Sequence, residues 1–146
     1  MNNLKDLLNE LNKVGREAKQ ILKAVEFDPY EELSGLAINY DNPDEVFLQE
    51  ELRGVLSKFD EAISTLEYLR KPITGTYTLH KNRNGRYECE RGELTSGSGI
   101  EFCHYNNFYE RYEWAGSRVE HDGKDYYIVG YNDVPLEGLK VRFRRW

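Results

Sequence analysis

The stretch LEYLRKPITGTYTLH, residues 66–80, marks the point at which the hydrophobic period of the sequence changes. Before it, apolar residues return every three or four positions, which is the period of an amphipathic helix. From Thr74 onward apolar and polar residues alternate, which is the period of a strand. Pro72 disfavours helical geometry at Lys71 and is expected to end the helix there. The sequence therefore predicts an α+β chain, with a helical part at residues 1–71 and a β part at residues 72–146.

Two long amphipathic helices are expected in the first part. Each carries apolar residues at alternating steps of three and four, as in the seam of a coiled coil. The seam residues are Leu4, Leu7, Leu11, Val14, Ala18, Ile21 and Val25, widened by Leu8 and Leu22, and then Leu48, Leu52, Val55, Phe59, Ala62, Leu66 and Leu69, joined by Ile63. Asn42 and Pro43 suit the N-cap and first turn of the second helix, and Gly15 predicts a close approach in the first. The two seams predict an antiparallel helical hairpin.

The connection between the helices, residues 27–41, is long but patterned. Its segment Asp28–Glu31 repeats the order of a cap and a proline at a helix start, so a short helix ending near Gly35 is expected. The residues expected to pack back onto the hairpin are Leu33, Leu36 and Ile38.

Short strands separated by turns are expected in the second part. The alternating segments are TGTYTLH (74–80), GRYECE (85–90), GIEFCHY (99–105), YERYEW (109–114), SRVEH (117–121), DYYIVGY (125–131) and GLKVRFR (138–144). Asn84-Gly85 and Asp122-Gly123 suit two-residue hairpin turns, because these residues tolerate positive φ. Closely spaced short strands predict a small antiparallel β-barrel, SH3-like or OB-like.

Composition limits the classes of function. The chain has 146 residues, a net charge of −6 and a mean hydropathy of −0.77, and no apolar run approaches the ~18 residues of a membrane span. It starts without the basic and apolar blocks of a secretory signal. Two cysteines, Cys89 and Cys103, are too few for a disulfide framework. We therefore expect a cytoplasmic protein that does not bind membranes.

Negative charge is concentrated in residues 27–71, which carry eleven carboxylates against four basic side chains. A compact acidic surface can enter the positively charged channel of a nucleic-acid-processing protein by mimicking phosphates. The candidate protein-binding residues are Asp28, Glu31, Glu32, Asp41, Asp44, Glu45, Glu50, Glu51, Asp60 and Glu61. Alternatively these are ordinary solubilising charges, since they spread over the polar arc of the second helix and form no stripe.

A basic stripe is expected on the last strand, because alternation in residues 139–144 places two sets of side chains on opposite faces. The core set is Leu139, Val141 and Phe143, and the basic set is Lys140, Arg142 and Arg144, followed by Arg145. The basic set suits phosphates or the carboxylates of a partner. Alternatively it pairs across the sheet with glutamates such as Glu88, Glu90 or Glu113.

The stretch NNFYERYEW, residues 106–114, holds four aromatic rings in nine positions. Period two places Phe108, Tyr112 and Trp114 on one face, which we expect to be core. Tyr109 and Arg111 fall on the other face, where a ring beside a cation suits base stacking. The candidate nucleic-acid or partner contacts are therefore Tyr109, Arg111, Lys140, Arg142, Arg144 and Arg145.

No motif indicates catalysis, a metal or a cofactor. Cys103 and His104 point to opposite sides of a strand, and neither has a metal-ligand spacing to Cys89 or His121. The glycine-rich segment GELTSGSG (92–99) lacks the lysine of a phosphate-binding loop and leads into a strand. We therefore expect a non-enzymatic protein without catalytic residues, metal or cofactor.

Three segments carry a resemblance to a known family: RYECERGELTSGSGIEF (86–102), SRVEHDGKDYYIVGY (117–131) and PLEGLKVRFR (135–144). They resemble a family of small, functionally uncharacterised β-rich proteins from phages and conjugative elements of Gram-positive bacteria. The resemblance implies a β-rich fold and a mobile genetic element as the setting. An acidic helical part joined to a small β domain also resembles the anti-CRISPR proteins that inhibit Cas9.

These observations favour a non-enzymatic interaction protein of a mobile genetic element, acting in the host bacterial cytoplasm. Its most concrete form is an anti-CRISPR-type inhibitor that binds a nucleic-acid-processing effector such as Cas9 or its guide-RNA complex. The alternative is a nucleic-acid-binding accessory protein that uses the basic and aromatic face of the β part. A homodimer formed through the helical hairpin is a further expectation.

Overall fold

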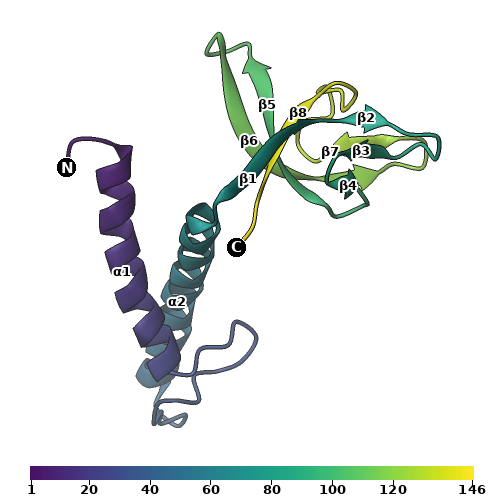
Figure 1. Ribbon diagram of the computed structural model, residues 1–146. Helices are drawn as coiled ribbons and strands as arrows, with labels where there is room; N and C mark the ends of the chain where they lie inside the picture. The colour runs from purple at the N-terminus through teal and green to yellow at the C-terminus, as the bar shows by residue number, and fades with distance from the viewer. The chain divides into compact units, whose positions relative to one another are not determined.

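The computed structural model describes all 146 residues of the chain. The chain divides into two compact units, the helical unit 1 (Met1–Lys71) and unit 2 (Pro72–Trp146), which is built of strands (Figure 1). The fold class is α+β with antiparallel sheets, as predicted. No helix combines the length and the apolar character that crossing a membrane requires.

Unit 1 contains the two predicted helices, α1 (Leu4–Ala24) and α2 (Pro43–Arg70). Asn42 caps α2 by accepting a hydrogen bond from the Asp44 N–H at 3.0 Å, and a proline occupies the first position of the helix. The helix ends where Lys71 adopts extended geometry before the next proline. The helices lie side by side and run in opposite directions (Figure 1), so the hairpin prediction is confirmed.

The connection between the helices is irregular, and the prediction of a short helix after Asp28 is wrong. The Asp28 carboxylate accepts a hydrogen bond from the Tyr30 N–H at 2.9 Å, which closes a turn. Leu33 is buried against the hairpin, and its N–H donates to Oε1 of Gln49 at 3.1 Å. Gln49 is only 3% exposed, so a buried glutamine of α2 holds the connection in place.

The two helices do not pack along the predicted seams. The buried core of unit 1 is formed by Ala18, Leu22, Leu33, Leu56 and Ile63. Several large side chains of the seams remain exposed instead: Leu7, Leu11, Val14, Ile21, Leu48, Leu52, Val55 and Phe59. The reason is that a single neighbour covers only one side of a wide apolar stripe. Gly15 does mark a close approach, since a Cβ there would lie 3.0 Å from Cδ1 of Leu66.

Unit 2 contains two antiparallel sheets. The strands are β1 (Ile73–Thr78), β2 (His80–Lys81), β3 (Tyr87–Cys89), β4 (Gly92–Glu93), β5 (Gly99–Asn106), β6 (Arg111–His121), β7 (Tyr126–Ile128) and β8 (Lys140–Arg144). The larger sheet has the order β1-β8-β5-β6-β7, and the smaller has the order β2-β3-β4. Neither sheet is closed, because β1 and β7 remain at opposite edges and β2–β4 pair only among themselves. The expected SH3-like or OB-like barrel is therefore not confirmed.

The core of unit 2 contains five fully buried side chains: Leu79, Phe102, Val119, Ile128 and Val141. Leu139 is also buried, and Phe143 packs against the cluster. The core face predicted for the last strand is therefore confirmed.

Both predicted turn dipeptides lie between strands, but neither forms a two-residue turn. Gly85 (φ 76°) and Gly123 (φ 95°) have positive φ, whereas the residues before them do not. The loops are longer, and an Asx side chain closes each of them. The carboxamide of Asn82 accepts from the Arg86 N–H at 3.1 Å, and the carboxylate of Asp122 accepts two backbone N–H groups of its own loop.

Gly75 lies at an irregularity in the pairing of β1 with β8, and we expect it not to tolerate a side chain. Its φ is 156°, and a Cβ there would lie 2.7 Å from the hydroxyl of Tyr77. Gly75→Ala should lower the free energy of unfolding by about 1–3 kcal/mol in a urea titration. Gly116→Ala is the control, because a Cβ at that position meets nothing within 4 Å. Equal losses in the two variants would contradict this account of β1.

Candidate interaction surface

The β5–β6 hairpin extends beyond the rest of its sheet. β5 and β6 pair along their length, but β8 pairs with β5 only at Glu101 and Phe102. On the other side, β7 pairs with β6 only from Val119 to His121. The far end of the hairpin is therefore a two-stranded ribbon, which projects from the other strands of unit 2 (Figure 1).

Four exposed aromatic side chains gather at this end and are here called the aromatic tip: Tyr105, Phe108, Tyr109 and Tyr112. Phe108 is 86% exposed and Tyr112 is 74% exposed. The rings of Tyr105 and Tyr112 meet across the hairpin with centroids 5.2 Å apart, and those of Phe108 and Tyr109 are 4.9 Å apart. The prediction that Phe108 and Tyr112 are core is wrong. Phe108 lies in the turn between β5 and β6, where strand alternation does not apply, and Tyr112 lies beyond the part of β6 that pairs with β7.

The side chain of Asn106 holds the loop that carries these rings. Its Oδ1 accepts hydrogen bonds from the N–H groups of Phe108 and Tyr109, at 3.0 and 3.1 Å. Its Nδ2 donates to Oε1 of Glu113 at 2.8 Å. These bonds satisfy backbone donors of an exposed turn and restrict its conformations. The turn that carries Phe108 and Tyr109 is therefore restricted in conformation by the hydrogen bonds of Asn106.

Arg111 places a cation beside the aromatic tip. Its guanidinium carbon lies 4.6 Å from the ring centroid of Tyr109, a cation–π geometry. Its Nε lies 3.3 Å from a carboxylate oxygen of Glu113. The hydrogen bond from Asn106, followed by that from Arg111, holds the pKa of Glu113 below its usual value. The structure therefore brings the candidates Tyr109 and Arg111 together at the surface, next to an ionised carboxylate.

Two arginines of the predicted basic stripe are engaged within unit 2. Glu101 on β5 is 6% exposed and binds both of them. Arg142 Nε donates to Oε1 of Glu101 at 2.7 Å, and Arg144 Nε donates to Oε2 at 2.5 Å. The Arg142 guanidinium also lies 4.1 Å from the ring centroid of Trp114. These side chains therefore hold β8 against β5.

Sequence reasoning missed Glu101 as the partner of the stripe. It named Glu88, Glu90 and Glu113, and the last of these binds Arg111 instead. The sequence feature that could have indicated Glu101 is a carboxylate among the apolar residues at the start of this strand. The register of β5 with β8, which places Glu101 opposite Arg142, is needed to identify it as the partner. The two other basic candidates, Lys140 and Arg145, are exposed.

The acidic candidates form a broad surface on unit 1. Asp28 is half-buried and the other nine are exposed. Glu45 accepts a hydrogen bond from the Asn39 N–H at 2.6 Å, and Glu50 pairs with Arg53 at 3.1 Å. The rest spread along the connection and around α2, so the acidic residues do not gather into one cluster.

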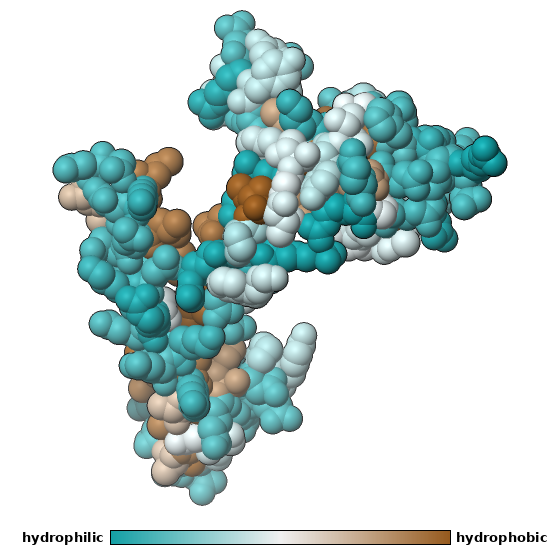
Figure 2. All heavy atoms as spheres, viewed as in Figure 1, coloured by the Kyte–Doolittle hydropathy of each residue, from teal (hydrophilic) through white to brown (hydrophobic).

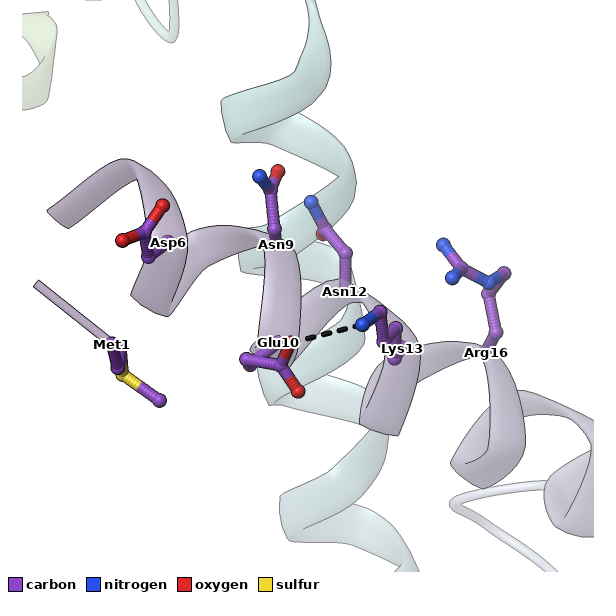
Figure 3. A pocket seen from close by; sticks show the side chains of 7 residues that line it. All are labelled: Met1, Asp6, Asn9, Glu10, Asn12, Lys13 and Arg16. Carbon is purple, nitrogen blue, oxygen red and sulfur yellow. Dashed lines mark hydrogen bonds and ion pairs between the residues drawn. The ribbon is translucent and has the colours of Figure 1, made fainter. Parts of the chain in front are cut away.

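Two hollows of unit 1 differ in their lining. One, of about 690 Å³, is lined by polar side chains of α1 around Glu10 and Lys13, together with Met1 (Figure 3). Figure 3 shows that, apart from Met1, these side chains come from a single helix, and Glu10 and Lys13 already pair at 2.9 Å. The other, of about 310 Å³, is mostly apolar and lies where the connection meets Leu48 and Leu52 of α2. No group of three or more His, Cys, Asp or Glu side chains is placed to hold a metal ion.

Glu101→Gln should strongly destabilise unit 2, because it removes the buried negative charge that binds two half-buried arginines. We expect a loss of about 3 kcal/mol in the free energy of unfolding, measured with urea. The control is Glu120→Gln, which breaks the more exposed pair with Arg118 (3.1 Å) and should cost less than about 1 kcal/mol. Similar small losses in both variants would show that Glu101 does not hold the arginines.

Asn106→Ala should raise the pKa of Glu113 toward the ordinary value of 4.5, because the carboxylate loses the hydrogen bond that lowers its pKa most. In the wild type, the lowered pKa means that Glu113 stabilises the folded tip above its unfolded pKa. This contribution is lost as pH falls through the folded pKa. Carboxyl NMR titration of both proteins gives the two pKa values. An unchanged pKa in the variant would contradict the role of Asn106.

Comparison with known protein families finds a match within unit 2. Residues 76–143 match the model of a family described as a domain of unknown function, DUF5348. The match starts within β1, ends within β8 and includes both Glu101 and the aromatic tip. No curated protein and no solved structure is similar enough to the chain to be matched. Most of unit 2 is thus similar to a family whose function is uncharacterised.

Proposed function

We propose that this chain is a non-enzymatic interaction protein that binds a macromolecular partner through the aromatic tip. The observation that carries the proposal is that the four rings of the aromatic tip are exposed beside Arg111, at a turn held by the hydrogen bonds of Asn106. Aromatic side chains and arginine dominate the binding energy of protein interfaces. Rings as exposed as those of Phe108 and Tyr112 bury little surface within their own unit, so contact with a partner accounts for them best.

The partner that we propose is a nucleic-acid-processing effector of a bacterial host, and Cas9 or its guide-RNA complex is the most concrete case. The setting would be a mobile genetic element. Support comes from the charge of unit 1, in which residues 27–71 carry eleven carboxylates against four basic side chains. Cas9-type effectors hold guide and target in positively charged channels. The acidic candidates would enter such a channel, and the aromatic tip would supply specific contacts.

Single-stranded nucleic acid is the alternative partner. The observation that favours it is the exposed stack of Arg111 on Tyr109, since bases stack on such platforms. The engagement of Arg142 and Arg144 by Glu101 weakens this alternative, because it reduces the basic surface offered to phosphates.

The double substitution Phe108→Ala and Tyr109→Ala should weaken binding to Cas9 by about 30-fold, as for the loss of an interface hot spot. The affinity is measured by calorimetry with purified Cas9, with and without guide RNA. Arg83→Ala, in the exposed loop between β2 and β3, is the matched control and should bind like the wild type. Absence of binding in either state of Cas9 would overturn this choice of partner.

Charge variants and a gel shift separate the remaining possibilities. Neutralising Glu51, Asp60 and Glu61 should weaken binding, whereas neutralising Glu88, Glu90 and Asp133 of unit 2, an equal change of charge, should not. A complex with single-stranded DNA or RNA at low salt, lost in Arg111→Ala, would support the alternative. No complex at low salt would eliminate it.

A further inference from the structure

Unit 1 keeps an apolar face uncovered within the hairpin. Six large side chains are each 38–55% exposed and are here called the open face: Leu7, Val14 and Ile21 of α1 with Leu48, Val55 and Phe59 of α2. Figure 2 shows hydrophobic, brown surface along this unit. Contiguous apolar patches of this kind mark interaction sites.

The exposed and buried positions repeat with the same seven-residue period. On α1, Val14 and Ile21 each precede by one residue a position that faces α2, Gly15 or Leu22. On α2, the exposed Leu48 and Val55 likewise precede the buried Gln49 and Leu56. One residue is about 100° of helix rotation. On both helices the exposed row is therefore rotated by this angle, in the same sense along the chain, from the row that faces the other helix. Because the helices run in opposite directions, both exposed rows lie on the same face of the hairpin.

We propose that a second copy of this chain covers the open face, so that two hairpins form a four-helix bundle with twofold symmetry. Apolar residues at three of seven positions suit a helix that contacts two neighbours in a bundle. Each helix of this hairpin has one neighbour. A second hairpin with the same period supplies the missing one, and a twofold axis makes the two open faces mutually complementary. This inference concerns unit 1 and does not depend on the proposed function.

The size of the face agrees with a dimer interface. With Leu11 and Leu52, which are 44% and 43% exposed, it offers on the order of 600 Å² per chain, close to the ~800 Å² of a standard interface. The groove of about 310 Å³ beside Leu48 and Leu52 continues the face at the connection.

Electrostatics give the dimer a characteristic salt dependence. Residues 1–71 carry fifteen carboxylates against nine basic side chains, so two copies of unit 1 repel each other. The open face itself is uncharged. Raising the salt concentration from about 50 to about 500 mM should therefore strengthen the dimer, whereas a contact made by the acidic residues would weaken.

Sedimentation equilibrium of the full chain, from about 1 to about 100 µM, tests the proposal. The mass should rise toward twice the 17.2 kDa of one chain. Val14→Glu and Val55→Glu should each raise the dissociation constant of the dimer by about 100-fold or more, because each buries an unpaired charge. Gln20→Glu and Ser64→Glu add the same charge at exposed positions away from the open face, and should remain dimeric. Circular dichroism checks that all four variants keep their helix content.

Two results would overturn the proposal. One is a mass of one chain at every concentration and salt, which would mean that another occupant, or none, covers the open face. The other is a dimer that persists in both Val14→Glu and Val55→Glu, which would place the interface elsewhere in the chain.

Discussion

A buried carboxylate shared by two arginines is the interaction on which unit 2 depends. Glu101 lies on β5, the central strand of the larger sheet, and binds Arg142 and Arg144 of β8. Each charge is costly to bury alone, so the three are stable only together. This constraint holds β8 beside β5 and leaves less basic surface for a partner. Arg111 then becomes the cation best placed for recognition, because it lies beside the exposed aromatic rings.

The extent of strand pairing decides where a contact surface forms. β8 reaches β5 at only two positions, so the end of the β5–β6 hairpin has strands on neither side. The aromatic pair of Tyr105 and Tyr112 stabilises the ribbon across its two strands, and both side chains remain exposed to solvent. Unit 1 also exposes apolar side chains where a neighbouring element is missing, because each helix covers only one side of the other's apolar stripe. If the open face joins two copies, the assembly carries two aromatic tips, and a partner with two sites would gain avidity.

Local patterns predicted much of this fold, whereas long-range contacts decided the rest. Asn42 and Pro43 start α2 and Pro72 follows its end, because caps and prolines act on adjacent backbone. Alternation also placed Val141 in the core. The rotation of the helix contact, the partner of Arg142 and the exposure of Phe108 depend on which elements lie beside one another. Periodicity does not specify such neighbours. It also does not specify whether the edge strands of a sheet pair with each other, so the expected barrel could not be derived from the strand pattern alone.

The central claim is that the aromatic tip, and not the basic stripe of β8, contacts the partner. Hydrogen exchange of the chain, alone and saturated with Cas9 or with single-stranded nucleic acid, tests it most directly. The account predicts slower exchange of backbone amides in residues 105–112 and unchanged exchange in residues 140–144. Protection confined to residues 140–144, with an unaltered tip, would contradict it.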